Sequence, residues 1–187
     1  LPFSKHFHVI MAFPNVWHSK LEPSGQFTNM ESVKKEVEMM MDPSADPFAA
    51  PDPDAPVEEP SRFGAKDVMD LNRIQLMNAY SCTECGRCTD ACPASQTGKK
   101  LSPRKIMMDT RDRLHEVSAV VDKHGEFKED GRSLLDDFIS REELWACTTC
   151  NACTEACPVN IDPMSIIVEM RRYLVMEESA ANPSLNT

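Results

Sequence analysis

Apolar residues recur at helical spacing over five stretches of this chain. An apolar residue at every third or fourth position is typical of a helix with one buried face. No stretch shows the regular alternation of apolar and polar residues that a half-buried strand requires. We therefore predict an all-α fold, with helices over residues 31–41, 62–81, 103–125, 134–139 and 163–178.

The helix predicted over 103–125 has recognisable ends. Ser102 is a favourable N-cap, and Pro103 suits the first helical position. Gly125 is expected to end the helix. The expected buried face comprises Ile106, Thr110, Leu114, Val117 and Val121. In the helix over 62–81, the apolar stripe comprises Val68, Leu71, Ile74 and Met77.

The last predicted helix begins with the same kind of signal, Asp162 followed by Pro163. Between the two long helices, Ser140 and Glu143 form a capping box that leads into a cysteine-rich run. In the last helix we expect Ile167, Met170 and Leu174 to face inward, and Arg171, Arg172, Glu177 and Glu178 to face solvent.

The segments before the main helices differ in composition. Residues 1–41 are expected to form an irregular juxtamembrane arm, because large apolar residues accompany Lys5 and Lys20 as at a membrane–water interface. An arm packed on the domain would have the same composition. Residues 42–61 contain six prolines, six acidic residues and no basic residue, which favours an extended linker. Residues 62–187 are then the folded domain.

Charge and hydropathy exclude several classes. The formal net charge of −10 argues against nucleic acid as a partner. The sequence has no run of 18 or more apolar residues, so it predicts no membrane span. The chain begins with Leu1 rather than methionine, and we expect it to be a fragment or a processed product of a longer protein.

All eight cysteines lie in two runs of the form C-x2-C-x2-C-x3-C-P. Such runs ligate [4Fe–4S] clusters in two-cluster ferredoxins, where the fourth cysteine of each run ligates the other cluster. Two-residue gaps let a short loop wrap three thiolates around one cluster, and the longer gap directs the fourth away. We therefore predict two [4Fe–4S] clusters, each with four ligands. The first set is Cys82, Cys85, Cys88 and Cys157, and the second set is Cys147, Cys150, Cys153 and Cys92.

Two other uses of cysteine fit this pattern less well. Structural zinc usually takes its ligands as two separated pairs, unlike three cysteines within seven residues. A disulfide framework is typical of small secreted proteins with many loops. Thiolates that ligate iron imply assembly in a reducing compartment.

The two runs form an internal repeat with an offset of 65 residues. Fifty-four residues, largely helical by prediction, separate Cys92 from Cys147. This gap is too long for the compact ferredoxin that contains β-strands. We expect an α-helical ferredoxin in which two cluster-binding loops are related by pseudo-twofold symmetry.

Residues 66–178 resemble the C subunit of heterodisulfide reductase and the related helical dicluster domains of succinate dehydrogenase and glycolate oxidase iron–sulfur subunits. The resemblance rests on three motifs, C-T-E-C-G-R-C-T-D-A-C-P, K-L-S-P-R-K-I and C-P-V-N-I-D-P-M. The iron–sulfur subunit of succinate dehydrogenase has an additional [2Fe–2S] domain and lacks one cysteine of the runs. This chain has neither feature, so it is more similar to the heterodisulfide reductase type.

The segment Pro2-Phe3-Ser4-Lys5-His6-Phe7-His8 resembles P-F-S-[KR]-x-x-H in gamma subunits of respiratory nitrate reductase. That resemblance implies that His8 ligates a haem b in the intact protein. A histidine at the membrane interface without haem is the alternative. Together, the two resemblances imply the tail of a fusion to a cytochrome b membrane domain, tethered at the cytoplasmic face of the inner membrane.

The expected function is an electron relay through two [4Fe–4S] clusters. It would connect a membrane haem or quinone module with a soluble subunit rich in C-C-G motifs, and would not be catalytic alone. Arg87 lies between two ligands and would raise the potential of its cluster, unless it is only a solvated surface group. The alternatives are an enzyme that reduces a disulfide at its own cluster and an iron–sulfur sensor or structural module. The enzyme is disfavoured because no cysteine is left over as a nucleophile.

Overall fold

The computed structural model describes residues 6–21, 26–42 and 62–181. Within these ranges every regular element is a helix, and an isolated bridge joins Leu135 and Ile139. The all-α fold is thus confirmed. The extended linker predicted over 42–61 lies, apart from Asp42, outside the described residues and stays a prediction.

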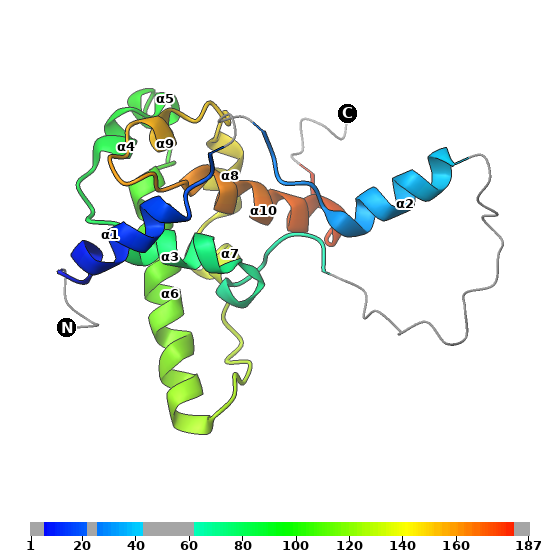
Figure 1. Cartoon of the computed structure of the whole chain (residues 1–187), viewed down its shortest axis with the longest axis horizontal. Helices are drawn as coiled ribbons and strands as arrows, with labels where there is room; N and C mark the ends of the chain where they lie inside the picture. The colour runs from blue at the N-terminus through cyan, green and yellow to red at the C-terminus, as the bar shows by residue number, and fades with distance from the viewer. Residues whose placement is uncertain (1–5, 22–25, 43–61, 182–187) are drawn as a thin grey trace.

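The helices follow one another along the whole described chain (Figure 1). In chain order they are α1 (Phe7–Trp17), α2 (Glu31–Met41), the 3-10 helix η1 (Val68–Asp70), α3 (Arg73–Ser81), α4 (Arg87–Asp90), α5 (Pro93–Gln96), α6 (Pro103–His124), α7 (Leu134–Asp137), α8 (Arg141–Ala146), α9 (Ala152–Glu155) and α10 (Pro163–Met176).

The two long helices, α6 and α10, build the core. The Ser102 hydroxyl accepts a hydrogen bond from the N–H of Lys105, and Gly125 ends α6 with a φ of +77°, so both predicted ends are confirmed. Asp162 caps α10 in the same way by accepting from the N–H of Ser165. The fully buried side chains of these two helices include Ile106, Met107, Ile166, Ile167, Met170 and Leu174.

The single helix predicted over 62–81 is wrong in its first half. The chain forms η1 and then starts again at Asn72, whose side chain accepts from the N–H groups of Ile74 and Gln75 at 2.9 Å. In turn, the side-chain oxygen of Gln75 accepts a hydrogen bond from the N–H of Asn72 at 3.0 Å. This capping box begins α3 anew and turns Ile74 outward, where it is 44% exposed.

The short helix predicted over 134–139 is also not regular. Leu135 is extended and Asp136 has a φ of +73°. The N–H of Leu135 donates to the carbonyl of Lys66 at 3.1 Å, a partner far away in sequence. Leu134, Leu135 and Ile139 are all buried, and the tertiary hydrogen bond replaces the helical one.

The first segment is not an irregular arm as predicted, because it contains helix α1. Phe7 packs edge-on against Tyr80 of α3, with ring centroids 5.9 Å apart. The helix predicted over 31–41 is confirmed as α2, which extends away from the other helices (Figure 1). None of the helices in the described ranges combines the length and the apolar character that crossing a bilayer requires.

A fully buried arginine, Arg113, joins three parts of the domain. Its guanidinium donates to Asp67 at 2.7 Å, to Asp130 at 2.6 Å and to the carbonyl of Arg132 at 2.7 Å. These hydrogen bonds lower the pKa of Asp130 to about 2, so that carboxylate stays ionised. Arg113 therefore ties the segment before α3 and the segment after α6 to the middle of α6.

Candidate metal centres

The first cysteine loop begins where α3 ends. Ser81 is the last helical residue, and Cys82 follows in an extended conformation. Glu84 and Gly86 have φ values of +60° and +87°, and these left-handed residues turn the chain sharply. The chain then enters α4, which carries Cys88.

The second loop repeats this geometry residue by residue. Cys147 follows the last residue of α8, Thr149 and Asn151 have φ values of +54° and +61°, and Cys153 lies in α9. Asn151 stands where the first loop has glycine, and asparagine is among the side chains that tolerate this conformation best. The internal repeat in the sequence is thus a structural repeat, and the helices α4 and α9 contact each other.

In each loop, a backbone N–H donates a hydrogen bond to the sulfur of the first cysteine. The N–H of Glu84 donates to the sulfur of Cys82, and the N–H of Thr149 donates to the sulfur of Cys147, both at 3.4 Å. Hydrogen bonds to sulfur stabilise the thiolate and tune the potential of a bound cluster. The same polar interaction therefore serves both loops.

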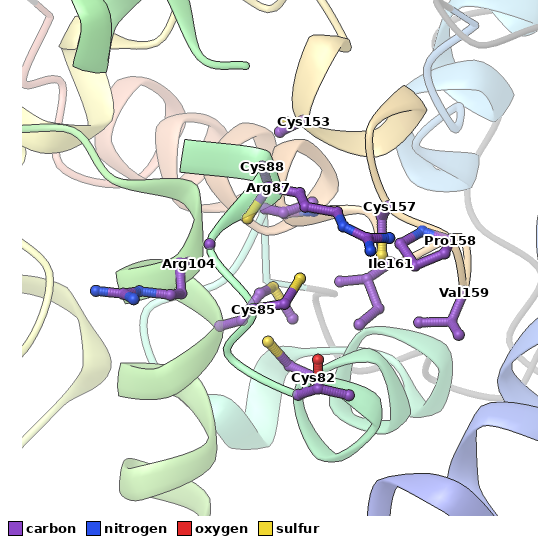
Figure 2. Close-up of a pocket in the computed structure, with 14 residues that line it drawn as sticks. Cys82, Cys85, Arg87, Cys88, Arg104, Cys153, Cys157, Pro158, Val159 and Ile161 are labelled. Atoms are coloured by element: carbon purple, nitrogen blue, oxygen red, sulfur yellow. The ribbon is translucent and has the colours of Figure 1, made fainter. Parts of the chain in front are cut away.

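The structure brings the first predicted set together. One cavity of about 60 Å³ is lined by Cys82, Cys85, Cys88 and Cys157. Cys153 of the second set, two arginines and several hydrophobic residues also line it. In Figure 2 these four side chains surround a common space, and Cys157 arrives from a separate segment of the chain. Burial is the main cause of the raised pKa of the Cys82 thiol, and the neighbouring Cys157 contributes to it.

In the second set, Cys147 is influenced by a cysteine of the first run. The pKa of the Cys147 thiol is raised mainly by burial, with a contribution from Cys92 of the first run. Burial likewise raises the pKa of Cys153 to about 12. The exposed Cys150 differs, because a hydrogen bond from the N–H of Ala152 lowers its pKa.

These donors fit a cluster with a separate iron for each cysteine. Around one zinc ion, four sulfurs at about 2.3 Å from the metal would lie roughly 3.8 Å from one another. Eight thiols, in two groups around left-handed loops, instead match the donor set of two cubane clusters. Their buried thiols would be held as thiolates by the positive charge of iron.

Arginines stand beside the first set. The side chain of Arg87 reaches across the cavity toward Cys157 and Pro158, whereas Arg104 points away from it (Figure 2). Arg111 of α6 forms an ion pair with Glu84 in the loop, with an N–O distance of 2.5 Å. Arg111 has no local sequence signal, because its partner lies 27 residues away along the chain.

The outward placement predicted for Arg171 is wrong. Its guanidinium is half-buried and donates to the carbonyls of Leu144 and Cys147, both at 2.5 Å. It also stacks over the ring of Trp145 at 5.1 Å. Arg172 is also half-buried, and it forms an ion pair with Glu169 with an N–O distance of 2.6 Å. Arg171 thus holds the start of the second loop by its backbone.

The ninth candidate, His8, lies in the first turn of α1 and is half-buried. It does not line the cavity of the first set. Its role as a ligand of haem b stays a prediction.

Comparison with known proteins gives the same assignment. Residues 81–161 match the family described as "4Fe-4S dicluster domain". The chain is 31% identical to the "Probable iron-sulfur-binding oxidoreductase FadF" of Bacillus subtilis over 95% of its own length and 26% of that protein's length. It is 35% identical to the "Probable membrane-anchored ferredoxin" of Chromohalobacter salexigens, over 69% of this chain and 20% of the relative. No solved structure matches the chain significantly.

A third relative belongs to a heterodisulfide reductase. It is the C subunit of the "Ferredoxin/F(420)H(2)-dependent CoB-CoM heterodisulfide reductase" of Methanosarcina acetivorans, with 31% identity over 60% of this chain and 56% of the relative. The chain thus spans about a quarter of FadF and little more than half of this third relative. Residues 81–161 therefore match the 4Fe-4S dicluster domain family, in a chain similar to the C subunit of heterodisulfide reductase.

Proposed function

We propose that this chain is an electron-transfer subunit with two [4Fe–4S] clusters and crossed ligands. The first set of cysteines holds one cluster, and the second set holds the other. One observation carries the proposal: in the cavity that Cys153 also lines, the Cys157 side chain lies around a common space with Cys82, Cys85 and Cys88, although Cys157 belongs to the other run. Crossed ligation fixes both clusters in one rigid unit.

The surroundings of the two sets suit a relay. When bound, each cluster supplies reversible one-electron chemistry. Each set has one exposed cysteine, Cys85 or Cys150, on which a partner can approach, while Cys92 and Cys153 are buried. Arg87 and Arg171 place positive charge near the first and second sets, which favours the reduced and more negative state.

The partners we propose are a membrane module with haem or quinone and a soluble subunit of heterodisulfide reductase type, rich in C-C-G motifs. The names of the relatives support this combination, since one is a membrane-anchored ferredoxin and another is part of a heterodisulfide reductase. The chain would then act at the cytoplasmic face of the inner membrane. In the intact protein, His8 would be an axial ligand of haem b.

Redox titration of the anaerobically reconstituted chain tests the relay. We expect about eight irons per chain and two reversible one-electron reductions by a low-potential donor. Zinc at stoichiometric amounts, or about four irons, would overturn the proposal. Turnover of a disulfide by the isolated chain would favour the enzyme that reduces a substrate at its own cluster. Clusters that cannot be reduced reversibly would favour a structural role.

A further inference from the structure

Helix α1 has two faces with different surroundings. Its inner face holds Asn15, which is only 1% exposed and donates from its side-chain amide to the carbonyl of Val159 at 2.8 Å. The hydroxyl of Ser81 donates to the carbonyl of Met11 at 3.1 Å. Both contacts lie at the first set, because Ser81 precedes Cys82 and Val159 lines the same cavity.

The outer face of α1 is apolar and lies open to solvent. Phe13 is 85% exposed and Trp17 is 83% exposed, although both are large hydrophobic side chains. Contiguous exposed apolar patches with polar surroundings mark sites of interaction with a protein or a membrane. We call this surface the α1 patch, formed by Val9, Ile10, Phe13, Val16, Trp17 and Leu21.

The charge around the α1 patch has the opposite sign to the rest of the chain. Residues 6–21 contain no acidic residue, whereas the whole chain has a formal net charge of −10. His6, His18 and Lys20 lie on or next to α1 and are exposed. An apolar face with aromatic rings at its edge, beside a lysine and two polar histidines and without an acidic residue, is complementary to an anionic bilayer surface.

We propose that α1 lies flat in the headgroup region of an anionic lipid bilayer, with the α1 patch toward the acyl chains. Eleven residues span only about 16 Å, so α1 lies on the bilayer and does not cross it. The first set then faces the membrane, separated from it by one helix of about 10 Å diameter. The orientation of the first set rests on the proposed function, because it requires the two sets to hold separate clusters. The binding of α1 to lipid does not rest on it.

Sedimentation with vesicles tests the surface. The cluster-loaded chain is mixed with vesicles of equal parts phosphatidylcholine and phosphatidylglycerol, and with vesicles of phosphatidylcholine alone. We expect binding to the anionic vesicles, and an affinity at least about tenfold lower for the Phe13→Ser/Trp17→Ser variant. The matched control is Met40→Ser/Met41→Ser on α2, where two side chains of similar exposure are removed; it should bind like the unchanged chain.

The orientation has a separate readout in EPR. A lipid with a paramagnetic gadolinium headgroup should speed the relaxation of the signal that Cys82→Ser alters more than that of the signal that Cys147→Ser alters. The reverse order, or equal effects, would contradict the orientation.

Absence of vesicle binding, or equal loss of binding in both double variants, would contradict the proposal that the α1 patch binds the membrane. If Phe13→Ser/Trp17→Ser instead abolishes dimerisation in lipid-free solution, the patch binds protein and the proposal is wrong. Failure of the clusters to load or reduce would overturn the relay and the orientation of the first set, whereas vesicle binding through the α1 patch would stand.

Discussion

At the scale of single residues, Gly64 has the least room for a side chain. Its φ is +75°, and a Cβ atom would come closer than 3.0 Å to the backbone of Glu169 and of Tyr173 in α10. The next residue, Ala65, donates its N–H to the carbonyl of Glu169 at 3.0 Å. Glycine here lets the start of the domain lie directly on the backbone of α10.

We expect Gly64→Ala to destabilise the domain by about 3 kcal/mol, because the backbones must separate and the left-handed residue gains a Cβ. The thermal midpoint of the cluster-loaded chain would then fall by about 10 °C. Gly98→Ala is the matched control, since Gly98 has a φ of +78° but nothing within 4 Å of the added carbon. Equal losses in both variants would mean that the close contact at Gly64 has no effect.

Arg171 is the residue that should distinguish the two clusters. Arg171→Met removes the hydrogen bonds to the carbonyls of Leu144 and Cys147 and a positive charge beside the second set. The potential of the second cluster should become more negative, and its EPR signal should change, while the first signal is kept. Arg172→Met is the control because Arg172 pairs with Glu169 instead. If both substitutions leave both potentials unchanged, Arg171 does not tune the site.

His8 is tested in a protein in which the proposed cytochrome b membrane domain precedes this chain. If His8 ligates haem b, His8→Ala should remove or shift one haem in the optical spectrum, because a neutral imidazole is lost as axial ligand. His18→Ala, also a histidine next to α1, should leave the spectrum unchanged. An unchanged haem spectrum in the His8 variant, with quinol still reducing the clusters, would make His8 a residue of the interface only.

The spacing of cysteines predicts the site better than it predicts the residues around it. The run C-x2-C-x2-C-x3-C-P spans only twelve residues, and its spacing alone predicts a loop that wraps three thiolates around one cluster. It also predicts that Cys157 lies beside the first loop, where the structure places it. Arg111 and Arg171 could not be assigned in this way. Their partners, Glu84 and Leu144, lie 27 residues away in each case, and such contacts depend on the packed fold.

At the scale of elements, helix ends with local signals were predicted well. The caps at Ser102, Ser140 and Asp162 form within three or four residues, so sequence spacing is sufficient. One error arose where a distant hydrogen bond decides, the bond from Leu135 to Lys66. Another arose over 62–81, where the local capping box of Asn72 and Gln75 was not recognised. Helix α1 was missed because the prediction for residues 1–41 rested on composition, whereas α1 contains Pro14 and packs on α3.

Arg113 connects the elements around α6, and its loss should be costly. Arg113→Met would leave Asp67 and Asp130 without the cation that binds them inside the domain. Removing one partner of a buried ion pair typically costs about 3 kcal/mol or more. Arg132→Met, in an exposed pair with Glu116, should cost less than about 1 kcal/mol. Thermal unfolding at equal cluster loading measures both. Similar midpoints for the two variants would contradict the role given to Arg113.

At the scale of the whole molecule, the two proposed clusters would connect segments that lie far apart in sequence. The first set would tie the end of α3 to the segment before α10, and the second would tie the end of α8 to the start of α5. Metal binding and folding would then be coupled. The proposed arrangement of the domain therefore depends on crossed ligation.

Low-temperature EPR of the reduced Cys157→Ser chain tests that claim most directly. If ligation is crossed, this substitution alters the same signal as Cys82→Ser, because both residues belong to the first set. The signal that Cys147→Ser alters should remain largely intact. If Cys157→Ser instead perturbs only the signal of the Cys147 cluster, each run holds its own cluster, and the crossed arrangement is contradicted.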